Sequence, residues 1–130
     1  MKKLDCILLV DDDEDCNFFH RRLIKKMGCA ERIEEAKNGL EALELIKSER
    51  ACPIDMILLD INMPVMDGWT FLAEYEKLPL EKRACIVVVM LTSSVNSDDV
   101  NHAHSQSVVS AFVNKYLDES RLRSLIESKF

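Results

Sequence analysis

Two apolar stretches of the chain end in aspartate, a residue that can bind a cation or act as a nucleophile. The first stretch, ILLVDDD, ends in Asp11, Asp12 and Asp13, and the second, MILLD, ends in Asp60. If both ends meet in the fold, their charges repel one another, so the carboxyls must bind protons or a cation. Carboxylate oxygens favour Mg²⁺ or Mn²⁺, and Mg²⁺ leaves coordination positions open for a phosphoryl group. These residues therefore indicate a metal-assisted phosphoryl site.

Two other apolar stretches end in side chains that complement such a site. Thr92 follows VVVML, and Lys115 follows AFVN. A hydroxyl donor and an ammonium group can both stabilise a phosphoryl group that arrives on a carboxylate. Taken singly, each residue has a more common structural role, and Asp13, Glu14 and Asp15 are expected to begin a helix. Four segments with complementary chemistry on one edge favour the functional interpretation.

Five segments of strand length must position these residues. Most are almost continuously apolar, which is typical of strands covered on both faces. One segment is rich in charged residues, as expected for an edge strand. The predicted strands are Cys6–Val10, Arg32–Ala36, Met56–Leu59, Ile86–Leu91 and Val108–Val113.

Apolar residues at helical spacing lie between and after the strands. The four stripes are Cys16, Phe19, Leu23 and Met27; Leu40, Leu43 and Ile46; Phe71, Leu72, Tyr75 and Leu78; and Leu122, Leu125 and Ile126. A further short helix is expected over residues 97–105. This alternation predicts an α/β, flavodoxin-like fold: a five-stranded parallel sheet of order 2-1-3-4-5 with five helices on both faces. In that order strands one and three are neighbours, so Asp11 and Asp12 are expected to converge with Asp60.

Composition narrows the function classes. The 130 residues fit one domain over residues 1–130, with no effector domain expected. A net charge of −6 and the lack of a Lys/Arg cluster argue against a nucleic-acid partner. No apolar run approaches the roughly 20 residues of a membrane span, and no cleavage site follows the first run. The five cysteines form no C-x-x-C pair, which suggests buried thiols in a reducing compartment. We therefore expect a cytoplasmic protein without a membrane partner.

The stretch MILLDINMPVMDGW, with the ordered aspartates, threonine and lysine, resembles the receiver domain of two-component response regulators. The resemblance covers about residues 5–129. It implies that Asp60 accepts a phosphoryl group from a sensor histidine kinase or a histidine phosphotransfer protein. It also implies a Mg²⁺ or Mn²⁺ site made by Asp11, Asp12, Asp60 and the backbone carbonyl of Asn62.

The same resemblance implies a conformational switch. Lys115 resembles the lysine that pairs with phosphate, and Thr92 and Phe112 resemble the coupled hydroxyl and aromatic switch pair. A core aromatic is the alternative interpretation of Phe112. Output would pass to an unidentified downstream protein by contact or by phosphorelay. The protein would catalyse only its own phosphorylation and dephosphorylation, and would not be an enzyme in the ordinary sense.

One residue departs from the family pattern. The lysine is usually followed by proline in a cis bond, whereas Tyr116 follows Lys115 here. A cis bond before a non-proline residue costs about 3 kcal/mol, so the cis and trans forms both remain open. This departure supports one alternative, a degenerate receiver that binds a partner without being phosphorylated.

Two enzymatic or cofactor-binding alternatives fit less well. An aspartate-nucleophile phosphohydrolase needs a second aspartate as acid and base, but Asn62 stands two residues after Asp60. A flavodoxin-like FMN protein needs a first loop rich in Ser, Thr and Gly, and the three aspartates would repel its phosphate.

Overall fold

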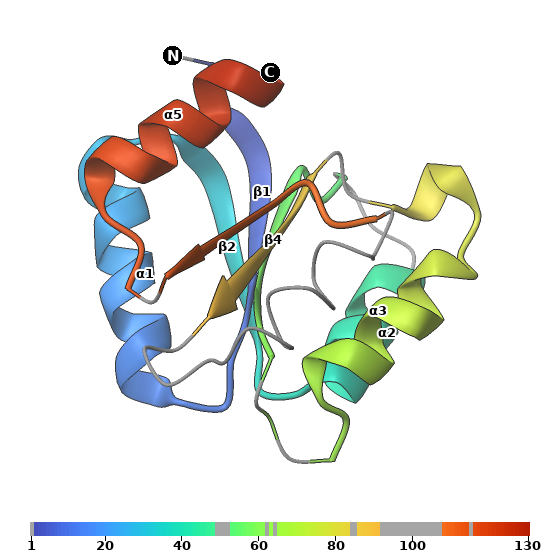
Figure 1. The fold of residues 1–130 in the computed structure, drawn as a ribbon. Coiled ribbons are helices and arrows are strands. Elements are labelled where there is room, and N and C mark those ends of the chain that lie inside the picture. The colour runs from blue at the N-terminus through green and yellow to red at the C-terminus, as the bar shows by residue number, and fades with distance from the viewer. Residues whose placement is uncertain are drawn as a thin grey trace.

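The chain folds as a layered α/β structure (Figure 1). This computed structural model describes residues 2–48, 53–61, 63, 65–83, 86–91, 108–114 and 116–130. The strands are β1 (Leu4–Val10), β2 (Ala30–Ala36), β3 (Met56–Asp60), β4 (Ile86–Leu91) and β5 (Ala111–Asn114). The helices are α1 (Glu14–Met27), α2 (Gly39–Lys47), α3 (Gly68–Glu76), the short 3₁₀ helix η1 (Leu80–Lys82) and α5 (Glu119–Lys129).

The five strands form one parallel sheet in the order β2-β1-β3-β4-β5, which confirms the predicted topology. Helices α1 and α5 cover one face of the sheet, and α2 and α3 cover the other (Figure 1). The charged segment forms the edge strand β2, as its composition indicated. The helix expected over residues 97–105 lies outside the described residues.

Side chains of the central strands alternate between two cores. Beneath α2 and α3, alternate residues of β1 pack with β3 and with apolar side chains of both helices. The intervening residues of β1 face α1 and α5. Strands that are buried on both faces explain the uninterrupted apolar runs of the sequence. The first core includes Leu8, Ile57 and Phe71, and the second includes Leu9, Leu58 and Leu122.

The apolar stripe predicted for α1 was correct for Cys16, which is buried, and for Leu23 and Met27, which pack against the core, but wrong for Phe19. The buried residues of the helix are Cys16, Asn17, His20 and Ile24, whereas Phe19 is 44% exposed. The helix therefore turns a histidine and an asparagine toward the sheet and leaves a phenylalanine at the surface. His20 Nε2 accepts from the Leu117 N–H, and Asn17 Nδ2 donates to the Asp11 carbonyl. These bonds offset part of the cost of burying the two side chains, and apolar periodicity cannot report them.

Three cysteines, Cys6, Cys16 and Cys29, are buried, which agrees with the prediction for them. Burial raises the pKa of the Cys29 thiol above its ordinary value of 9.0, although a backbone hydrogen bond and Arg123 act in the opposite direction. Cys52 and Cys85 lie outside the described residues. Among the residues that are described, no helix has the length and apolar character to cross a membrane.

Candidate functional site

Three carboxylates meet at the carboxyl edge of the sheet, as the sequence predicted. One oxygen from each of Asp11, Asp12 and Asp60 lies within 4.8 Å of the others. Asp11 is fully buried and Asp60 is 2% exposed, whereas Asp12 is exposed. Two buried acids beside a third, with mutual repulsion and costly desolvation, form a pocket suited to a cation.

Strand register brings these residues together across about fifty positions of sequence. Val10 at the end of β1 pairs with Leu59 of β3 in the parallel ladder. The next residue on each strand is an aspartate, so Asp11 and Asp60 extend side by side beyond the pair. The Asp11 N–H donates to the Ala36 carbonyl at 3.0 Å, which holds the end of β1 against β2.

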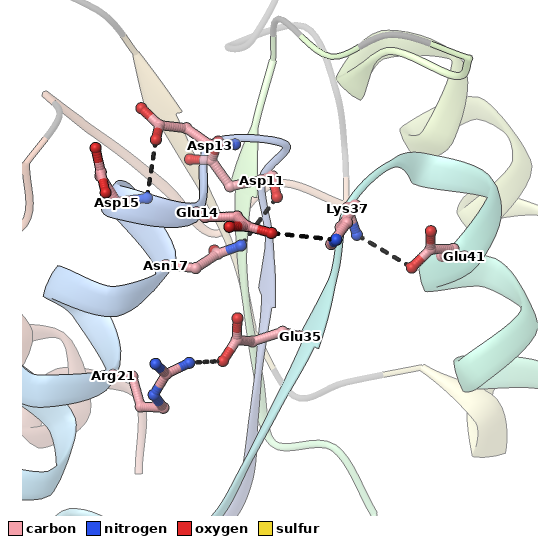
Figure 2. Close-up of polar contacts among 9 residues, drawn as sticks. All are labelled: Asp11, Asp13, Glu14, Asp15, Asn17, Arg21, Glu35, Lys37 and Glu41. Carbon is pink, nitrogen blue, oxygen red and sulfur yellow. Dashed lines mark hydrogen bonds and ion pairs between the residues drawn. The ribbon is translucent and has the colours of Figure 1, made fainter.

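Local hydrogen bonds fix the orientation of Asp11. Its Oδ1 accepts from the Asp13 N–H at 2.9 Å, an arrangement typical of aspartate at a turn. Its backbone carbonyl accepts from Nδ2 of the buried Asn17 at 2.9 Å (Figure 2). One side-chain oxygen and the carbonyl are thus committed to the protein, and the carboxylate is oriented before any ligand binds.

The start of α1 follows from the third aspartate. Asp13 is the N-cap, and its Oδ1 accepts from the N–H groups of Asp15 at 2.9 Å and Cys16 at 3.4 Å. Glu14 and Asp15 occupy the first turn, where the helix dipole favours negative charge. This confirms the capping role predicted for Asp13, Glu14 and Asp15. It separates the functions of the acidic run: Asp11 and Asp12 belong to the cluster, and Asp13 begins the helix.

Ion pairs join α1 to the edge of the sheet beside the site (Figure 2). Lys37 Nζ lies 3.2 Å from a Glu14 carboxylate oxygen, and Arg21 forms an ion pair with Glu35. The Lys37 N–H also donates to Glu41 Oε1 at 3.3 Å. Exposed pairs of this kind contribute about 0–1 kcal/mol each, so the buried Asn17 bond matters more for Asp11.

The loop after β3 is tightly packed against Asp60. The Gly68 N–H donates to the Ile61 carbonyl at 2.9 Å. A Cβ at Gly68 would lie 2.7 Å from the Ile61 Cα and 2.9 Å from the Asp60 carbonyl oxygen. Val65 has a positive φ of 68°, which is strained for a β-branched residue. Glycine at position 68 is therefore required for this chain path.

The spacing of the carboxylates fits a small divalent cation. Ligands at about 2.1 Å from Mg²⁺ lie no more than about 4.2 Å apart, so a slight closing of the 4.8 Å cluster suffices. All the side-chain donors are carboxylates, and no cysteine or histidine that would select zinc belongs to the cluster. The donor set thus suits Mg²⁺ or Mn²⁺.

Of the other predicted site residues, the structure describes only Phe112. Asn62, Thr92 and Lys115 lie outside the described residues. Phe112 is half-buried on β5, pairs with Val89 and packs against the core beneath α2 and α3. This position is compatible with the core role and leaves the switch role as a proposal.

Sequence reasoning missed the buried polar residues of α1. The apolar stripe of this helix includes neither Asn17 nor His20, although both are buried. The sequence signal for this polar pair was the spacing of three residues between Asn17 and His20, which places both on one face of the helix. Their partners, Asp11 and Leu117, lie directly after β1 and after β5, so only the fold identifies them.

Comparisons with known proteins agree on one family. The model of the response regulator receiver domain matches residues 7–127. Response regulator Rcp1 from Synechocystis is 34% identical over 119 residues, which cover 88% of this chain and 76% of that protein. A solved two-component response regulator from Cytophaga hutchinsonii has a TM-score of 0.84 at 26% identity, with 98% of this chain and 97% of that chain covered.

A further relative is much longer than this chain. Sensor histidine kinase CheAY from Helicobacter pylori is 33% identical over 123 residues, which cover 92% of this chain and 15% of the kinase. The similarity therefore concerns a small part of that protein.

Proposed function

This chain belongs to the family of response regulator receiver domains, the phosphoacceptor switches of two-component signalling, and we propose that Asp60 is its phosphoacceptor. The observation that carries the proposal is the convergence of Asp11, Asp12 and Asp60 within 4.8 Å. Asp60 ends a central strand at the edge where ligands of open α/β sheets bind. Residues 1–130 would form one receiver domain.

In the proposed reaction, a carboxylate oxygen of Asp60 attacks the phosphorus of a phosphohistidine on a sensor histidine kinase or a histidine phosphotransfer protein. The O–P bond forms as the N–P bond breaks, and the imidazole leaves with the electron pair of that bond. A bound Mg²⁺ or Mn²⁺ ion would supply positive charge for the phosphoryl oxygens. Asp11 and Asp12 would hold this ion together with Asp60 and the carbonyl of Asn62.

Residues from two other strand ends complete the proposal. Thr92 directly follows β4, and Lys115 directly follows β5. Lys115 would pair with the phosphoryl oxygens, and the Thr92 hydroxyl would donate to one of them. Movement of Thr92 would change the space available to Phe112, and the surface around β5 and α5 would shift between two states.

The signal would leave through a protein partner, either by contact with the phosphorylated surface or by phosphorelay. The domain would turn over no substrate apart from its own phosphoryl group. The buried thiols of Cys6, Cys16 and Cys29 fit a reducing cytoplasmic environment.

The test is the intact mass of the protein after incubation with Mg²⁺ and a small acyl phosphate. We expect one added phosphoryl group on the wild type, none on Asp60→Asn and none with excess chelator. Asp67→Asn is the matched control, because Asp67 caps α3 through the Thr70 N–H at 2.9 Å and asparagine caps equally well. This variant should be phosphorylated like the wild type.

Two other results would change the assignment. A wild type without an adduct would favour the degenerate receiver that only binds a partner. An adduct that persists in Asp60→Asn would place the phosphoryl group on another residue and contradict the proposal.

A further inference from the structure

A buried histidine of α1 joins this helix to the segment after β5. His20 is fully buried, and its Nε2 accepts from the Leu117 N–H at 3.2 Å. The two residues are 97 positions apart in sequence. Because Nε2 accepts, the proton of the neutral ring is on Nδ1, which lies 3.7 Å from the Cys16 sulfur.

Aromatic contacts strengthen the same connection. The ring centroid of Tyr116 lies 5.2 Å from that of Phe19, in an edge arrangement, and 6.0 Å from that of His20. Phe19 and His20 are themselves in edge contact at 5.5 Å. Leu117 is 1% exposed and belongs to the core beneath α1 and α5. One hydrogen bond and two ring contacts thus attach residues 116–117 to a single helix.

This attachment lies next to the lysine of the proposed site. Lys115 is outside the described residues, but it is bonded to Asn114 on one side and to Tyr116 on the other. Asn114 pairs with Leu91 in the sheet, and Leu117 is bonded to His20. Since consecutive Cα atoms are about 3.8 Å apart, fixed positions on both sides restrict the path of the backbone between them.

Because Tyr116 stands where a proline would stiffen the chain, the backbone beside Lys115 must be restricted by other contacts. A proline after the lysine would fix its own φ through its ring, whereas tyrosine leaves this dihedral free. The conformation of the segment must therefore come from tertiary contacts. Leu117 packs in the core beneath α1 and α5, and His20 and Phe19 add the hydrogen bond and the ring contacts.

We propose that His20 is a positioning residue, which orients Lys115 for phosphoryl transfer by holding the Leu117 N–H. This inference rests on the proposed function, since it needs phosphorylation at Asp60. His20 is not a catalytic residue, because it acts through Leu117 and Lys115 rather than on the phosphoryl group. A histidine that serves only as a satisfied core residue would stabilise the fold without a specific effect on Lys115.

The test compares His20→Leu with His20→Gln. Leucine fills the core but leaves the Leu117 N–H without its acceptor, whereas the Oε1 of glutamine can reach the position of Nε2. Rate constants for phosphorylation are measured at saturating Mg²⁺ and acyl phosphate, together with the Kd for Mg²⁺. We expect His20→Leu to lower the rate constant about tenfold with little change in Kd, because misplacing a reacting partner slows the step itself. His20→Gln should stay within about twofold of the wild type.

Ile24→Ala is the matched control, because Ile24 is one turn further along the same buried face of α1 and its side chain carries no hydrogen-bond acceptor for the Leu117 N–H. It should lower Tm and leave the rate constant unchanged. If Ile24→Ala slowed phosphorylation as much as His20→Leu does, the effect of His20 would be one of general stability. The same conclusion would follow if His20→Gln were as slow as His20→Leu.

A double-mutant cycle shows whether His20 acts through the lysine. In a Lys115→Ala background, His20→Leu should have almost no further effect on the rate constant. Independent, multiplicative effects would overturn the proposal while leaving Asp60 as the phosphoacceptor. If His20→Leu does not fold, Tyr116→Ala takes its place in the cycle, because Tyr116 is 55% exposed and its truncation spares the core. A wild type that is not phosphorylated would instead contradict the proposed function.

Discussion

At the scale of single residues, the site consists of two buried carboxylates and a third, exposed carboxylate that adds to their negative charge. Asp11 is held by hydrogen bonds from Asp13 and Asn17, and Asp60 is buried at the end of a central strand. Asp12 is exposed, so its carboxylate contributes charge without supporting the core. It is therefore the residue at which metal binding can be changed with the least effect on folding.

Asp12→Asn should weaken the binding of Mg²⁺ without destabilising the metal-free protein. A ligand present at a hundred times its Kd stabilises the folded state by about 2.7 kcal/mol. For a domain of this size, that amounts to a rise of roughly 10 °C in Tm. Thermal unfolding with Mg²⁺ and with chelator should show this rise in the wild type and a much smaller one in Asp12→Asn.

Asp15→Asn is the control for that measurement. Asp15 is exposed and belongs to the same acidic run, but it lies in the first turn of α1, outside the cluster. Its substitution should leave the Mg²⁺-dependent rise in Tm intact. Equal losses in both variants would mean that Mg²⁺ responds to the overall negative charge rather than to a built site.

Residue types predicted the cluster of three carboxylates, whereas the buried hydrogen bonds beside it were missed. Aspartate at two strand ends was sufficient to place Asp11, Asp12 and Asp60 together. The roles of Asn17 and His20 depend on partners in other elements, and no local pattern in α1 carries that information.

At the scale of elements, the start of α3 lies tightly against the end of β3. A methyl group at Gly68 would collide with the backbone of Ile61 and Asp60, which cannot move aside as a side chain can. We expect Gly68→Ala to lower the free energy of unfolding by about 1–3 kcal/mol, the usual effect of overpacking. Because the collision displaces Asp60, phosphorylation should slow as well.

Gly28→Ala separates the two effects. Gly28 ends α1 with a φ of 61°, and a Cβ there would meet no atom within 4 Å. Alanine in this left-handed conformation costs roughly 1–2 kcal/mol. Gly28 precedes β2 at the amino edge of the sheet, so the variant should lose similar stability and keep its phosphorylation rate. Denaturant unfolding and phosphorylation kinetics of both variants would check this, and a rate loss in Gly28→Ala would show that stability alone sets the rate.

The elements differ in how well the sequence predicted them. Long apolar runs identified β1, β3 and β4, since strands buried on both faces need no polar residue. Strand β5 begins at Ala111, later than the predicted Val108, because the sheet pairs only from that residue onward. The α1 stripe was correct except for Phe19, but it omitted Asn17 and His20, because two of the four residues that this helix buries are polar.

At the scale of the whole molecule, the function depends on topology. A sheet of order β2-β1-β3-β4-β5 makes neighbours of the two strands that end in aspartate. Handedness and strand number were sufficient to predict this order, because few parallel arrangements satisfy both. The polar edge is shared by segments from the start, middle and end of the chain, and two separate cores support it.

The central claim is that this convergence builds a divalent cation site at Asp60. The most direct test is an anomalous difference map from a crystal of the protein grown with Mn²⁺. We predict a peak between the carboxylates of Asp11, Asp12 and Asp60, and its loss in crystals of Asp12→Asn. Carboxylates that point away from one another, or a wild-type map with no peak between them, would contradict the account.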